Sequence, residues 1–131
     1  MNEVVSNLTV MWVGIGGGIG AILRYILGNI INNKCQMDFP LSTFIINITG
    51  AFIIAYLSVL LSVEWTNRYG SIYTSLILTG VLGGYTTFSS MQLDALKLYE
   101  SGKKFLSLFY LFITVSSGFF GAALGVGLAS L

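Results

Sequence analysis

Charge is scarce in this sequence of 131 residues: only 8% of its side chains are charged, whereas a soluble domain has roughly 25%. Disorder is excluded as well, because a chain that is 55% hydrophobic does not have the polar composition that keeps a segment unfolded. Histidine is absent and Cys35 is the only cysteine, so neither an internal disulfide nor a zinc site is expected. A net charge of +1 offers no basic surface for nucleic acid, and no nucleic-acid partner is expected.

Apolar residues fill the sequence instead and give it a mean hydropathy of +0.85. Four long stretches carry no charge at all: residues 4–23, 39–63, 69–93 and 105–131. Each is long enough for a helix to cross a hydrocarbon core of about 30 Å, which takes roughly 20 apolar residues. We therefore predict an all-α membrane protein, with residues 1–131 forming a single domain of four transmembrane helices. The predicted helices are at about 8–30, 41–63, 71–98 and 104–130.

The few basic residues give this predicted bundle little preference for one orientation in the bilayer. One side has Arg68 as its only basic residue, whereas the other holds Lys34, Lys103 and Lys104, with Lys97 close by. The positive-inside rule favours the second side in the cytoplasm, but a bias of two or three charges leaves both orientations open. A four-helix protomer also has little room for a solvent cavity, so transport would need a second copy, and weak bias allows the copies to pack antiparallel.

Glycines recur at helical spacing in the first and last of these stretches. Small residues at every third or fourth position let two helices approach closely, and such packing drives association in lipid. We therefore predict helix contacts along two stripes: Gly14, Gly16, Gly18 and Gly20 in the first stretch, and Gly118, Gly121 and Gly125 in the last.

Polar side chains inside the predicted spans are functional candidates, because they are costly in a membrane. Thr43 and Asn47 share one face of the second helix, and Tyr110 and Thr114 share one face of the fourth. Two simpler interpretations remain open. In the first, the Asn47 side chain does no more than form a hydrogen bond between two helices. In the second, a serine or threonine hydroxyl donates to the backbone carbonyl four residues earlier in its own helix.

The third stretch contains the strongest local anomaly, Gly-Gly-Tyr-Thr-Thr-Phe-Ser-Ser-Met-Gln over residues 83–92. Glycine and β-branched residues weaken a helix, so we predict a break near the centre of this span. A break frees backbone carbonyls at membrane depth, where another group must satisfy them, and a cation is one choice. A simple kink is the alternative.

Titratable groups are missing from the centre of every predicted span, where proton-coupled transporters usually place one. Neutral hydroxyl and amide donors, together with aromatic ring edges, would instead suit a passive pathway for a small anion. Arg24 ends the first stretch, and it either reaches to the interface or places a positive charge at a water-filled vestibule.

Three motifs resemble the CrcB/Fluc family of fluoride channels: GGGIGAILRY at 16–25, LSTFIINITGAF at 41–52 and GVLGGYTTFSSMQLD at 80–94. The resemblance covers nearly the whole chain. It implies a channel, not an enzyme, that exports fluoride passively across the bacterial plasma (inner) membrane as an antiparallel, dual-topology homodimer with two pores. A gradient-driven small transporter and a non-transporting membrane scaffold are the alternatives.

The resemblance also implies roles for individual residues. Arg24 matches the vestibule arginine, and the backbone carbonyls of Gly83 and Thr86 match the ligands of a sodium ion at the dimer axis. Met91 stands where the family has a second pore phenylalanine, which leaves open that the chain is one subunit of a heterodimeric channel. The predicted pore residues are Thr43, Asn47, Phe88, Ser89, Ser90, Met91, Tyr110 and Thr114.

Overall fold

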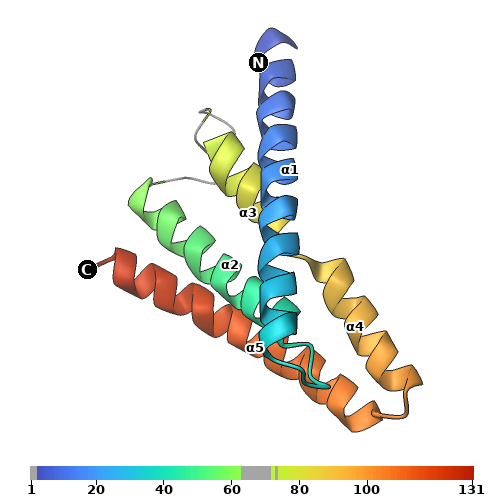
Figure 1. The fold of residues 1–131 in the computed structure, drawn as a ribbon. Helices are drawn as coiled ribbons and strands as arrows, with labels where there is room; N and C mark the ends of the chain where they lie inside the picture. The colour runs from blue at the N-terminus through green and yellow to red at the C-terminus, as the bar shows by residue number, and fades with distance from the viewer. Residues whose placement is uncertain (1–2, 63–71, 73) are drawn as a thin grey trace.

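The computed structural model describes residues 3–62, 72 and 74–131, and all regular structure in this part of the chain is helical (Figure 1). This confirms the predicted all-α class. In chain order the elements are α1 (Glu3–Lys34), α2 (Leu41–Leu60), the π-helix η2 (Thr74–Val81), α3 (Leu82–Tyr85), α4 (Phe88–Glu100) and α5 (Lys104–Ala129).

Three of these helices, α1, α2 and α5, are long and apolar enough to cross a membrane. Few of their residues are buried inside the protomer although most are apolar, as expected for helices whose solvent is lipid. Helix α1 is longer than predicted, and α2 begins as predicted, directly after Pro40. The predicted end of the second span at 63 and start of the third at 71 lie outside the described residues.

The predicted third span is not one helix, and the break expected near its centre is confirmed. Helix α3 ends at Tyr85 and α4 begins at Phe88, while Thr86 and Thr87 between them have extended backbone with ψ angles of 154° and 114°. Each of η2, α3 and α4 is too short to cross a bilayer alone. The predicted third span is therefore divided into η2, α3 and α4. That its pieces together make a fourth crossing stays a prediction.

Glycine contacts pair α1 with η2 and α3, and pair α5 with α2 (Figure 1). A Cβ atom added at Gly16 or Gly20 would collide with the backbone of η2 or α3, and one added at Gly125 would collide with that of α2. The stripes are thus confirmed in part. Three of their members meet nothing within 4 Å: Gly14, Gly18 and Gly118.

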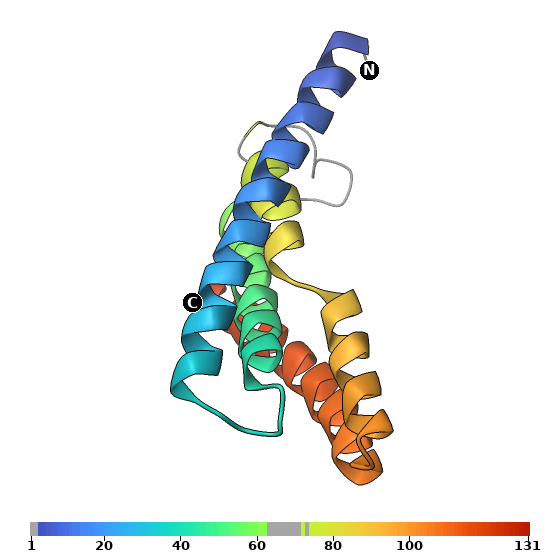
Figure 2. The same cartoon turned by 45° about the vertical axis from the view of Figure 1, so that its right-hand side comes forward.

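Helix α4 diverges from α3 after the break and packs on the first half of α5 (Figure 2). Met91, Ala95 and Leu98 form a small core with Tyr110, and Phe39 packs against it from the turn before α2. The Ser107 hydroxyl donates to the Ala95 carbonyl oxygen at 2.7 Å, which ties α5 to α4. This packing places the start of α4 beside α2.

Candidate functional site

The break is held from α2 by the side chain of Asn47. Its Nδ2 donates to the Thr87 carbonyl oxygen at 3.0 Å, and its Oδ1 accepts from the Thr87 N–H at 2.9 Å. One amide therefore satisfies both backbone groups of a residue that has left the helix. Thr87 is buried, and a buried polar group without a partner costs about 1–3 kcal/mol, so this amide stabilises the break.

Thr87 also caps α4. Its Oγ1 accepts from the Ser90 N–H at 3.1 Å and donates to Ser90 Oγ at 3.0 Å, and it lies 3.3 Å from Ser89 Oγ. A threonine N-cap with extended backbone is the usual start of an α-helix. The hydroxyl groups of Thr87, Ser89 and Ser90, which follow the two glycines of the motif, therefore form the hydrogen-bonded start of α4.

The other side of the break loses a hydrogen bond. In a continuous helix the Thr87 N–H would donate to the Gly83 carbonyl, but here it donates to Asn47. The Thr86 N–H and hydroxyl both donate to the Leu82 carbonyl, each at 3.0 Å. The Gly83 carbonyl is thus left without its helical donor, and Gly83 itself faces open space.

Other residues of α2 also contact the interrupted span, on both sides of the break. Thr43 Oγ1 donates to Asp94 Oδ2 at 2.7 Å, and Thr49 Oγ1 lies 2.9 Å from the Tyr85 hydroxyl. Gly50 leaves room for Thr86 and Tyr85, because an added Cβ would overlap the Thr86 methyl group. Helix α2 thus contacts the interrupted span on both sides of the break.

Thr43 and Asp94 lie in the wall of a cavity of about 540 Å³ that opens between the turn before α2 and the end of α4. Of the predicted pore residues, the structure brings Thr43 and Ser90 into its lining. The lining residues are Asn32, Cys35, Met37, Asp38, Phe39, Pro40, Ser42, Thr43, Ser90, Leu93, Asp94, Lys97, Leu98, Ser101 and Lys103.

Phe88 and Met91 lie on the other side of α4, along an apolar cavity of about 570 Å³ between α4 and α5. Phe88 is 67% exposed, so its ring is free to meet another molecule, whereas Met91 is only 5% exposed and belongs to the core. The predicted pore residues are therefore divided between two faces of α4 within one protomer.

Tyr110 and Thr114 are buried in α5 and line neither of these two cavities. The Thr114 hydroxyl donates to the Tyr110 carbonyl oxygen at 2.6 Å, so it bonds back to the preceding turn of α5, and its place in the pore stays a prediction. The Tyr110 hydroxyl is buried with no hydrogen-bond partner within the described part of the chain. Arg24 is half-buried on α1 and also lies outside the cavity that Thr43 lines.

Asp94 is the site residue that sequence reasoning missed. It ends the third motif and follows Ser90 by four residues, so both side chains lie on the same face of α4. That spacing, together with a hydroxyl at Thr43 on the predicted neighbouring helix, is the signal that could have identified it. Asp94 borders the uncharged stretch 69–93 and was noted only as the last residue of the third motif.

Long apolar helices and an interrupted helix braced by a half-buried amide indicate a multi-pass membrane protein. The family described as "CrcB-like protein, Camphor Resistance (CrcB)" matches residues 11–126. The chain belongs to the CrcB family, and the identification made from the three sequence motifs is confirmed.

Curated relatives match nearly the full length of the chain. "Fluoride-specific ion channel FluC 2" of Brucella suis is 55% identical over 127 residues, which is 97% of this chain and 98% of that protein. The protein of the same name from Yersinia pseudotuberculosis is 53% identical over 95% of this chain and 99% of its own length. "Fluoride-specific ion channel FluC" of Helicobacter pylori (strain P12) is 39% identical over 94% of each chain.

Proposed function

We propose that this chain is a fluoride-specific ion channel through which F⁻ leaves the cytoplasm passively. The chain is therefore a transport protein and not an enzyme. The observation that carries this is the 55% identity over 97% of the chain to a relative with that printed name. The bacterial plasma membrane is the proposed location.

The chemistry near the break supports passage of a small anion. An amide nitrogen has two N–H donors, and Asn47 uses one of them on Thr87, which leaves the second for a ligand. The exposed ring of Phe88 adds an edge with partial positive charge, which attracts an anion. We assign these two side chains to the pore, with Thr43, Ser89 and Ser90 as neighbouring hydroxyls.

A second, antiparallel copy of the chain would complete the pathway. The predicted pore residues of α4 lie on two faces of this helix, with Ser90 at one cavity and Phe88 at the other, and these faces do not meet within one protomer. The Phe88 ring is exposed on the protomer surface. A second protomer packed against this exposed side would supply the wall of the pore that faces Phe88. The two-fold arrangement would then produce two equivalent pores, with Tyr110, Thr114 and Arg24 as further members.

A sodium ion at the dimer axis fits the groups that the break exposes. Sodium is a hard cation that takes oxygen ligands, and the Gly83 carbonyl has lost its helical donor in an open position. The carbonyls of Gly83 and Thr86 from both copies would hold it. Its positive charge would balance the partial negative charge of these carbonyl oxygens at a depth that water does not reach.

Purified protein in liposomes loaded with fluoride or chloride tests the proposal. We expect rapid F⁻ release, little Cl⁻ release and no dependence of F⁻ release on an imposed proton gradient. Release only after a homologous chain is added would identify a heterodimeric channel. Equal rates for both anions, or no release from folded protein of either composition, would overturn the proposal.

One observation favours the alternative of a gradient-driven transporter. Asp94 places a titratable carboxylate against Thr43 in the cavity wall, which sequence reasoning did not foresee. If proton coupling operates, fluoride release should follow the proton gradient, and Asp94→Asn should abolish that dependence. A passive channel predicts no dependence to abolish.

A further inference from the structure

We propose that Lys103 and Lys97 set the rate at which anions are captured at the cavity that Thr43 and Asp94 line, and that Asp38 lowers this rate by pairing with Lys103. The proposal rests on the proposed function, because it concerns the approach of the permeating anion. None of these three residues belongs to the predicted pore.

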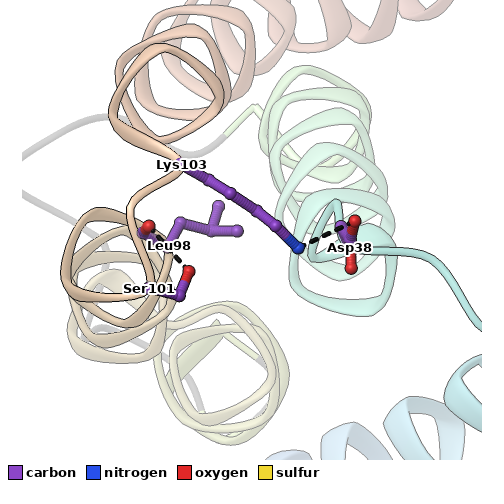
Figure 3. A network of polar contacts seen from close by, with 4 residues as sticks. All are labelled: Asp38, Leu98, Ser101 and Lys103. Atoms are coloured by element: carbon purple, nitrogen blue, oxygen red, sulfur yellow. Dashed lines mark hydrogen bonds and ion pairs between the residues drawn. The ribbon is translucent and has the colours of Figure 1, made fainter.

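Lys103 is held at the cavity rim by the turn between α4 and α5 (Figure 3). The Lys103 N–H donates to the Leu98 carbonyl at 2.9 Å, and the Gly102 N–H donates to the Tyr99 carbonyl at 3.1 Å. These two bonds, with Gly102 at φ 87°, form the helix-ending turn known as the Schellman motif. The Ser101 hydroxyl adds a bond to the Leu98 carbonyl at 2.9 Å.

Asp38 is held on the opposite side of the rim by its neighbours in the chain. The Phe39 ring packs edge-on against Phe44 and Tyr110, with centroid distances of 5.4 and 5.3 Å. Pro40 follows as the N-cap residue of α2. The turn before α2 is thus anchored to the core one residue after Asp38, which places the Asp38 backbone on this side of the cavity.

Across the rim, Lys103 Nζ lies 2.8 Å from Asp38 Oδ2 (Figure 3). The two side chains are 43% and 70% exposed, and ion pairs this accessible to solvent contribute little to stability. Holding the fold together therefore does not account for the pair. Its clear physical effect is to cancel one positive charge at the cavity opening.

The cavity contains two lysines, Lys97 and Lys103, and two carboxylates, Asp38 and Asp94. Asp38 is paired to Lys103 and Asp94 is bonded to Thr43, whereas no described carboxylate lies within ion-pair distance of Lys97. Like charges in a low-dielectric cleft focus the field and raise the local concentration of counter-ions. Removing Asp38 would shift the formal charge of the cavity from zero to +1.

Charge-changing variants with matched controls test this proposal in liposomes at low ionic strength. We expect Asp38→Asn to raise initial F⁻ flux about two-fold, and Lys103→Gln or Lys97→Gln to lower it about two-fold, as for a unit charge some 10 Å from the ion in water. The double variant Asp38→Asn/Lys103→Gln should return to the wild-type rate.

Glu100→Gln and Lys104→Gln are the controls, because they make the same charge changes near the same turn outside the cavity lining. Lys104 instead lies over the Tyr99 ring at 5.0 Å. Both should change F⁻ flux less than the variants of the cavity lining do, because Coulomb interaction weakens with distance from the ion. In about 1 M of an inert salt, where the Debye length is roughly 3 Å, the differences between variants should disappear.

Cys35 allows a second test without further mutation, since the only cysteine of the chain lies in the cavity lining. A cationic methanethiosulfonate reagent should raise F⁻ flux, and an anionic one should lower it. A neutral reagent of similar size should show the change in flux that is due to the added bulk alone. Cys35→Ser should respond to none of them.

The two proposals fail in different ways. Wild-type protein that releases F⁻ while the Asp38, Lys97 and Lys103 variants match their controls would overturn the present proposal alone. So would equal effects of the cationic and anionic reagents. Wild-type protein without F⁻ flux, both alone and with a homologous chain, would overturn the proposed function itself.

Discussion

The two ends of α4 are built in different ways. Its first turn depends on Asn47, which is 40 residues earlier in the chain and satisfies both backbone groups of Thr87. Its last turn is completed within residues 98–103 by local hydrogen bonds and Gly102. A helix end inside the membrane has no water to satisfy it and needs a partner helix, whereas an end at the aqueous rim needs only its own neighbours.

Replacing Asn47 should have the largest effect. Asn47→Leu removes both hydrogen bonds and leaves the Thr87 N–H and carbonyl buried without partners, at about 1–3 kcal/mol each. We expect fluoride flux to fall at least about 25-fold, because the two groups together cost about 2 kcal/mol or more and each 1.4 kcal/mol is roughly a 10-fold change. The thermal midpoint should fall too. Asn33→Leu, at an exposed position of α1, is the control and should preserve flux.

Phe88→Ile should separate function from stability at the same end of α4. The Phe88 side chain is 67% exposed, so its loss costs the fold of the protomer little, but the aromatic edge offered to the anion disappears. We expect about a 10-fold loss of flux, as for 1.4 kcal/mol, with an unchanged thermal midpoint. Phe105→Ile, at an exposed ring near the start of α5, should change neither. Unchanged flux in Phe88→Ile would contradict a place for this ring in the pore.

Thr87→Val should weaken the first turn of α4 more modestly. Valine keeps the shape of threonine but cannot accept from the Ser90 N–H, and losing an N-cap costs about 1 kcal/mol. The thermal midpoint should fall by a few degrees and the flux a few-fold. Thr87→Ser, which retains the hydroxyl, should restore both. If Thr87→Val has the thermal midpoint and flux of the wild-type protein, the Thr87 cap does not stabilise the start of α4.

Gly102→Ala should have the smallest effect on transport. Gly102 has φ 87°, and a side chain in this left-handed region costs about 1–2 kcal/mol. We expect a lower unfolding midpoint in a denaturant series but an unchanged flux per folded protein. Gly127→Ala, at an open position of α5, should not lower the midpoint. A loss of flux as large as that in Asn47→Leu would remove the distinction between the two ends.

The long helices and the break were predictable from local composition. The uncharged stretches set α1, α2 and α5, and the Gly-Gly and Thr-Thr pairs marked residues 83–87 as a weak helix. The π-helix η2 was not predictable in this way. It packs Gly80 against Gly16 of α1, a tertiary contact without a local signal.

The candidate site was predictable as a set of residues but not as an arrangement. Asn47 and the residues around Thr87 were each noted, yet nothing in the sequence says that the amide would bind this backbone. Met91 was placed in the pore, but the direction of α4 turns it into the core, where it is 5% exposed. Side-chain orientation depends on how α4 leaves the break, which only the packed structure determines.

A planar bilayer recording with fluoride on one side and chloride on the other tests the central claim most directly. For a fluoride-specific channel, the reversal potential should follow the fluoride concentration and stay constant when chloride is changed, and Asn47→Leu should abolish the current. A reversal potential that follows chloride, or no current from folded wild-type protein, would contradict the account.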